Sequence, residues 1–106
     1  MGLANEHCRS ILAGEKPLKE SEARELARQV PAWKLSANSL SREFKFGDFF
    51  LAMSFVNRVA ATAINEDHHP DIFISFDKVK LAFSTQKVGG LTRNDFIMAA
   101  KSDCIY

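Results

Sequence analysis

The sequence predicts an α+β fold: a four-stranded antiparallel sheet with helices packed on one face, in the order α-β-β-α-β-β-α. Four short segments alternate apolar and polar residues with a period of two, as half-buried strands do. Three segments instead repeat apolar residues with the helical period. The 106 residues, 46% hydrophobic and 25% charged, suit one domain with its own core. We therefore expect a single domain over residues 1–106, beginning with an irregular arm over residues 1–16.

The first half of the chain predicts one helix and two strands. Ser21 is a candidate N-cap for the first helix, which Pro31 ends. Residues 32–36 form a short strand that carries Trp33 and Leu35 on one face. Residues 39–46 form the second strand, in which Leu40, Arg42, Phe44 and Phe46 alternate with Ser41, Glu43 and Lys45.

The second half predicts a central helix, a hairpin and a last helix. Asp48 is expected to cap the central helix, which stops before Pro70 because a residue preceding proline avoids the helical region. Its core face is expected to comprise Phe49, Met53, Val56, Ala60 and Ala63, widened by Leu51, Phe55 and Val59. Residues 71–77 and 78–85 alternate as strands around a turn at Asp77–Lys78. Thr92 and Asp95 then predict a capping box for the last helix.

Charge and composition narrow the functional classes. The net charge of +1 gives no basic face for direct nucleic-acid binding, and no apolar run approaches the ~20 residues that span a bilayer. The N-terminus lacks the basic segment and apolar block of a secretory signal, so we expect a cytoplasmic protein. Cys8 and Cys104 are expected to be free thiols. His7 beside Cys8 lacks a second closely spaced ligand pair, so no metal site is expected.

The segment NEDHHP, residues 65–70, contains two of the three histidines in the chain. Adjacent residues cannot easily bind one metal, because their side chains diverge in both strands and helices. Nucleophilic catalysis needs a Ser or Cys beside the base, and the sequence indicates no such partner. General acid/base chemistry suits an imidazole that titrates near neutral pH. The alternative is structural: the histidines cap the helix end and bond to backbone carbonyls.

The stretches EDHHPDIF, DKV and GGLTRNDFIMAAKSD resemble the pterin-4a-carbinolamine dehydratase family, over about residues 31–103. In some animals a member also serves as the dimerisation cofactor of a homeodomain transcription factor. The resemblance implies dehydration of a 4a-hydroxy-tetrahydropterin to the quinonoid dihydropterin, in tetrahydrobiopterin recycling, with no cofactor and no metal. It also implies a homodimer or homotetramer, to which the exposed edges of a small sheet lend themselves.

The resemblance also implies the site residues. The catalytic set falls on His68, His69, Gln86 and Asp95, with one histidine as base and the other holding the pterin. The substrate-binding set falls on Asp67, His68, His69, Phe76, Ser84, Thr85, Gln86 and Lys87.

Two positions depart from the family pattern. Gln86 stands where the family usually has a third histidine, and Ile64 stands where an ionisable residue is common. Glutamine forms hydrogen bonds but delivers no proton at neutral pH, so the expected activity is reduced. Glu66 is near Ile64 in sequence, but helical geometry points it elsewhere. The alternatives are a slow or non-catalytic pterin-binding protein, and a protein-interaction or coactivator module.

Overall fold

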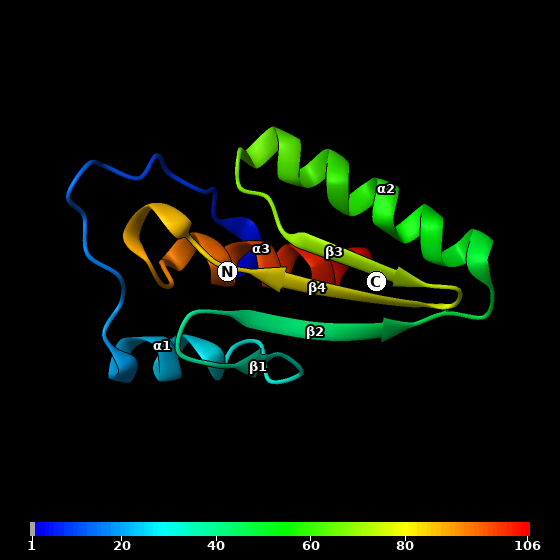
Figure 1. The fold of residues 1–106 in the computed structure, drawn as a ribbon, viewed down its shortest axis with the longest axis horizontal. Helices are drawn as coiled ribbons and strands as arrows, with labels where there is room; N and C mark the ends of the chain where they lie inside the picture. The colour runs from blue at the N-terminus through cyan, green and yellow to red at the C-terminus, as the bar shows by residue number, and fades with distance from the viewer. Residues whose placement is uncertain (1) are drawn as a thin grey trace.

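The computed structural model describes residues 2–106 and confirms the predicted α+β fold (Figure 1). The helices are α1 (Glu20–Ala27), α2 (Phe49–Glu66) and α3 (Arg93–Ile105), and the strands are β1 (Lys34–Leu35), β2 (Leu40–Lys45), β3 (Asp71–Ser75) and β4 (Lys78–Phe83). Two short 3-10 helices, η1 (Leu3–Asn5) and η2 (Gln86–Val88), complete the chain. Among residues 2–106, no helix is both long and apolar enough to cross a membrane.

The four strands form one antiparallel sheet in the order β1-β2-β4-β3. β2 pairs with β4 along its whole length, from Leu40 opposite Phe83 to Lys45 opposite Lys78. Alternate side chains of these two strands are buried on the face that the helices cover: Leu40, Phe44, Val79, Leu81 and Phe83. This alternation places the core where the sequence predicted it. It also leaves β3 as the longer of the two edge strands.

Helix α2 begins where predicted and buries much of the predicted face. The Asp48 carboxylate accepts a hydrogen bond from the Leu51 N–H at 2.8 Å, so the predicted N-cap is confirmed. The buried residues are Ala52, Phe55, Val56, Val59 and Ala63. The prediction was right at Phe55, Val56, Val59 and Ala63 and wrong at Phe49 and Leu51, which are 50% and 48% exposed. The helix carries apolar residues on more than one side, so the sequence alone did not show where the buried face ends.

The sequence predicted the N-cap of α3 correctly but not the N-cap of α1. Ser21 lies inside α1 and is not its cap; the N-cap is Lys19, whose N–H donates to the Glu22 carboxylate at 2.8 Å. In α3 the predicted capping box is confirmed, since the Thr92 N–H donates to the Asp95 carboxylate at 2.9 Å. The Asp95 carboxylate is consequently fixed at the first turn of α3.

The β3–β4 turn lies one residue earlier than predicted. Ser75 pairs with Lys78, so the turn residues are Phe76 and Asp77, and Lys78 already belongs to β4. Phe76 has φ +52°, a left-handed conformation that usually falls to glycine or asparagine. By residue type, Asp77 and Lys78 are more typical of a turn than Phe76 and Asp77. The pairing of β3 with β4 nevertheless places the turn at Phe76 and Asp77.

Candidate active site

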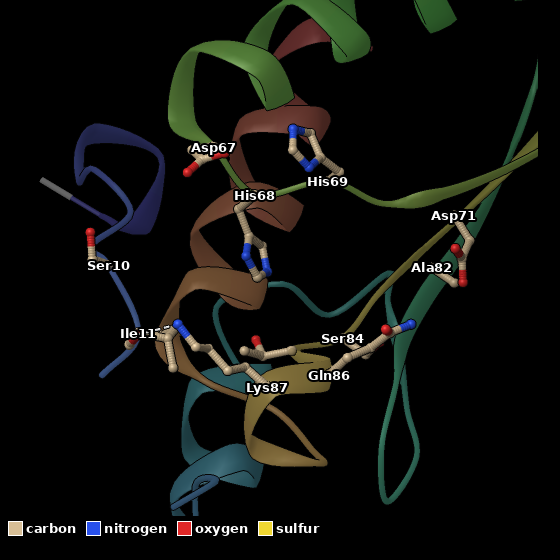
Figure 2. A pocket seen from close by; sticks show the side chains of 11 residues that line it. Ser10, Ile11, Asp67, His68, His69, Asp71, Ala82, Ser84, Gln86 and Lys87 are labelled. Atoms are coloured by element: carbon tan, nitrogen blue, oxygen red, sulfur yellow. Dashed lines mark hydrogen bonds between the residues drawn. The ribbon is translucent and has the colours of Figure 1, made fainter. Parts of the chain in front are cut away.

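Two adjacent histidines, His68 and His69, lie in the link between the end of α2 and the edge strand β3. Asp67 ends the helix with φ +55° and ψ +43°, a left-handed conformation that Asp tolerates better than most residues. The His68 N–H still bonds to the Ala63 carbonyl at 3.1 Å, after which Pro70 prevents further helix. The chain enters β3 at Asp71. In Figure 2 the rings of His68 and His69 leave this short link in different directions.

The His68 ring is bonded to a buried carboxylate. Its Nε2 lies 2.6 Å from Oδ1 of Asp95, a side chain with no solvent exposure. The other oxygen, Oδ2, accepts hydrogen bonds from the Thr92 N–H at 2.9 Å and the Thr85 hydroxyl at 2.8 Å. Asp95 therefore caps α3 and orients His68 with one carboxylate. An Nε2–H donated to Asp95 leaves Nδ1 of the neutral ring to accept a proton.

A cavity of about 380 Å³ opens beside His68, within the size range of small-ligand sites. Seven residues assigned to the site from the sequence line it together: Asp67, His68, His69, Ser84, Thr85, Gln86 and Lys87. Figure 2 shows the end of α2 above the cavity and the segment from Ser84 to Lys87 below it. Two segments about 16 residues apart in sequence thus form opposite walls of one site.

One expected site residue, Asp95, lies behind the cavity wall, and Thr85 in the wall is bonded to it. Asp95 does not line the cavity, and its carboxylate is bonded to two residues that do, His68 and Thr85. Its assignment to the catalytic set stays a prediction, and its contacts favour a role in positioning His68. Thr85 lines the cavity, but its hydroxyl is bonded to Asp95 at 2.8 Å and to the Thr92 hydroxyl at 2.9 Å. We conclude that Thr85 supports the His68–Asp95 pair.

Phe76 lies apart from the other expected site residues. It occupies the β3–β4 turn, is 68% exposed and does not line the cavity. Because β3 is extended, five residues carry the chain roughly 16 Å from Asp71 to Phe76. The assignment of Phe76 to substrate binding stays a prediction, and one that the geometry of a single chain does not support.

Neither Ile64 nor the nearby Glu66 supplies an ionisable group to the cavity. Ile64 is 72% exposed on α2. The Glu66 carboxylate turns the other way, accepting the Cys8 N–H at 2.7 Å and lying 2.8 Å from Nδ1 of His7. The Cys8 N–H, His7 and Lys101 at 4.0 Å together hold the pKa of Glu66 below its usual value.

The Cys8 thiol is half-buried beside Glu66. Burial, with the nearby Glu66 charge, raises the pKa of this thiol to about 12. Since the thiolate is the reactive form, Cys8 has little nucleophilic character at neutral pH. Among residues 2–106, no three His, Cys, Asp or Glu side chains are grouped so that they could hold a metal ion.

Four cavity residues were not anticipated from the sequence: Ser10, Ile11, Asp71 and Ala82. Asp71 follows His69 by two residues and pairs with Ala82 across the sheet, so strand alternation after the histidines is a signal for both. Ser10 and Ile11 carry no such signal. They belong to the N-terminal arm, which reaches the site only through tertiary contacts with residues more than 50 positions away.

Comparisons with known proteins show which family the chain belongs to. The family model described as pterin 4 alpha carbinolamine dehydratase matches residues 16–105. This chain belongs to that family. A Xylella fastidiosa protein with the provisional name pterin-4-alpha-carbinolamine dehydratase is 42% identical over 106 residues, covering 98% of this chain and 91% of the relative. A Stenotrophomonas maltophilia protein with the same provisional name is 43% identical over 105 residues, covering 97% and 90%.

A solved structure supports the same fold assignment. The Brucella melitensis protein titled a transcriptional coactivator/pterin dehydratase superposes with a TM-score of 0.81 at 34% identity. The match covers 85% of this chain and 98% of that one. The resemblance found from the residues around His68, His69 and Asp95 is therefore confirmed at the level of the family.

Proposed function

We propose that this protein dehydrates a 4a-hydroxy-tetrahydropterin to the quinonoid dihydropterin by general acid/base catalysis. The observation that carries the proposal is the meeting of His68, His69 and the segment from Ser84 to Lys87 in one cavity, with Asp95 bonded to His68. The reaction removes a proton from a ring nitrogen and the hydroxyl from the neighbouring carbon, and both leave as water. It needs a base, an acid and a site that holds the planar ring.

His68 is the base in this mechanism. Asp95 fixes its orientation and stabilises the imidazolium that forms when the ring takes the substrate proton. His69 is exposed at the cavity wall, and within residues 2–106 no group hydrogen-bonds to its ring, so it is free to hold the pterin. Gln86 lies in the opposite wall, where its amide can bond to the hydroxyl but cannot protonate it, so the departing hydroxide takes its proton from solvent water.

The glutamine at position 86, where the family usually has a histidine, lowers the rate of dehydration but does not abolish pterin binding. Loss of a positioned acid costs about 10²-fold or more, while the hydrogen bonds that hold the pterin remain. The protein is thus a slow dehydratase, acting in the cytoplasm in the recycling of tetrahydrobiopterin, as the family resemblance implies. A pterin-binding protein without turnover is the second candidate, and the absence of an ionisable side chain at Gln86 and Ile64 favours it.

The protein is expected to act as a homodimer or homotetramer. Edge strand β3 exposes Phe73 (58%) and Ile74 (41%), and α2 exposes Phe50 (75%) and Ile64 (72%). Exposed large apolar side chains on a sheet edge and on a helix otherwise packed in the core support an interface between subunits. A protein-interaction role, the third candidate, would use the same surfaces.

The deciding experiment is a dehydration assay on 4a-hydroxy-tetrahydrobiopterin generated in situ. Formation of the quinonoid product above the uncatalysed rate is expected for the wild-type protein, with a loss of at least about 10²-fold in His68→Ala. Tight pterin binding with no rate above background would establish the second candidate instead. Full activity in both His68→Ala and His69→Ala would overturn the proposed mechanism.

A further inference from the structure

Residues 6–15, named here the docked arm, run along one side of the cavity without forming helix or strand. In Figure 2 Ser10 and Ile11 of this segment face the cavity from the side opposite Asp71 and Ala82. The whole docked arm precedes the family match, which begins at residue 16. The family resemblance therefore assigns it no role, and any role has to come from its contacts.

The docked arm is anchored to both helices that carry the His68–Asp95 pair. At α2, the Glu66 carboxylate accepts the Cys8 N–H at 2.7 Å, one residue before Asp67. At α3, the Asn94 side chain bonds the Arg9 backbone twice, accepting from its N–H at 3.1 Å and donating to its carbonyl at 2.8 Å. These anchors hold residues 8 and 9 and so fix where Ser10 and Ile11 lie.

A third anchor crosses from the opposite wall of the cavity. Nζ of Lys87 donates to the Ile11 carbonyl at 3.1 Å (Figure 2). At the far end of the arm, Glu15 accepts the Leu12 N–H at 3.1 Å and pairs with Arg9, which closes the segment into a loop. The segment is thus tied to three separate elements although it has no secondary structure of its own.

Ile11 supplies a large apolar side chain to a cavity whose other walls are mainly polar. Of the eleven residues that line the cavity, Ile11 has the only large aliphatic side chain; Ala82 is small and the others are polar or charged. Small-ligand sites combine apolar contact area with a few placed polar groups. A pterin has polar ring edges and flat apolar faces, so the other walls match its edges and Ile11 matches a face.

From these contacts we infer that the docked arm is part of the substrate site, in which Ile11 packs against a face of the pterin ring and sets its affinity. The inference rests on the proposed function of the same cavity. The acid/base groups lie on the other walls, so Ile11 governs binding and not the proton transfers.

The test compares Ile11→Ala with Leu12→Ala. Leu12 is the next residue of the arm, is 70% exposed and does not line the cavity, so it controls for the loss of an aliphatic side chain. Dehydration kinetics give KM and kcat, and calorimetric titration with 7,8-dihydrobiopterin gives a dissociation constant without turnover. For Ile11→Ala we expect KM and the dissociation constant to rise roughly tenfold at unchanged kcat. Leu12→Ala should match the wild-type protein in all three.

Two results overturn the inference and leave the proposed function standing. Equal dissociation constants for Ile11→Ala and Leu12→Ala would show that the arm does not contact the ligand. A fall in kcat at unchanged KM would assign Ile11 to the chemistry or to the fold instead of to binding. If the wild-type protein neither binds 7,8-dihydrobiopterin nor turns over the carbinolamine, the proposed function itself fails, and the inference falls with it.

Discussion

Nε2 of His68 lies 2.6 Å from Oδ1 of Asp95, a carboxylate that is fully buried and that also caps helix α3. The same side chain thus stabilises a helix N-terminus and orients the candidate base. If His68 is the base, the start of α3 and the turn after α2 are coupled through this one side chain.

Asp95→Asn is expected to lower kcat by roughly 10²-fold with a smaller effect on KM, because an amide no longer stabilises the imidazolium of His68. Steady-state kinetics over a range of pH measure the effect, and circular dichroism confirms the fold. The matched control is Thr85→Val, which removes one hydrogen bond to Asp95 but keeps its charge, and which should cost less. Equal losses in both variants would point to disturbed packing in place of lost orientation.

Gln86→His is expected to raise kcat, by tenfold or more, because it restores an ionisable group to the cavity wall opposite His68. The control is Gln86→Asn, which keeps an amide and adds no proton donor. A gain in both variants, or in neither, would place the acid for the departing hydroxyl elsewhere in the site.

Glu66→Gln is expected to destabilise the protein by about 1–3 kcal/mol near neutral pH, since the buried carboxylate loses charge-assisted bonds to the Cys8 N–H and to His7. The pKa of Glu66 is lowered in the folded state, so its contribution is complete above the ordinary value of 4.5. The contribution disappears as the pH falls through the lowered folded-state pKa. The difference between the unfolding temperatures of the two proteins should therefore shrink as the pH is lowered from 7 toward 3.

Iodoacetamide at pH 8 is expected to label Cys104 at least about tenfold faster than Cys8. Cys104 is exposed, whereas Cys8 is half-buried with a thiol pKa raised to about 12. Peptide mass spectrometry gives both rates in one sample, with Cys104 as the internal reference. Asn94→Ala removes the two bonds to Arg9 and should accelerate labelling of Cys8 alone. Unchanged Cys8 labelling would mean that Asn94 does not hold the docked arm.

Light scattering is expected to give a mass that is a multiple of 11.9 kDa, as the exposed apolar residues of α2 and β3 imply. Phe50→Asp should shift the mass toward the monomer, because Phe50 is 75% exposed in the single chain and its loss costs the monomer little. Leu12→Asp, at a similarly exposed apolar residue on the arm, should leave the assembly intact. A monomeric wild-type protein would remove the basis for the proposed interface.

The sequence by itself determined the order of the elements, the strand alternation, the Asp48 cap and the Thr92–Asp95 capping box. These features depend on interactions within a few residues, and such interactions leave periodic or fixed-offset patterns. The resemblance around NEDHHP then selected seven residues that do share one cavity. Local pattern and family likeness together were enough for the fold and for most of the site.

Only the tertiary structure decided where the buried face of α2 ends, where the β3–β4 turn lies, and how Asp95, Phe76 and the docked arm relate to the cavity. The apolar character of a residue indicates that it tends to be buried, but it does not indicate which neighbours the residue packs against. The Cys8–Glu66 and Arg9–Asn94 bonds join residues 58 and 85 positions apart. Contacts of that range exist only once the chain is packed, so the wall formed by Ser10 and Ile11 was invisible in the sequence.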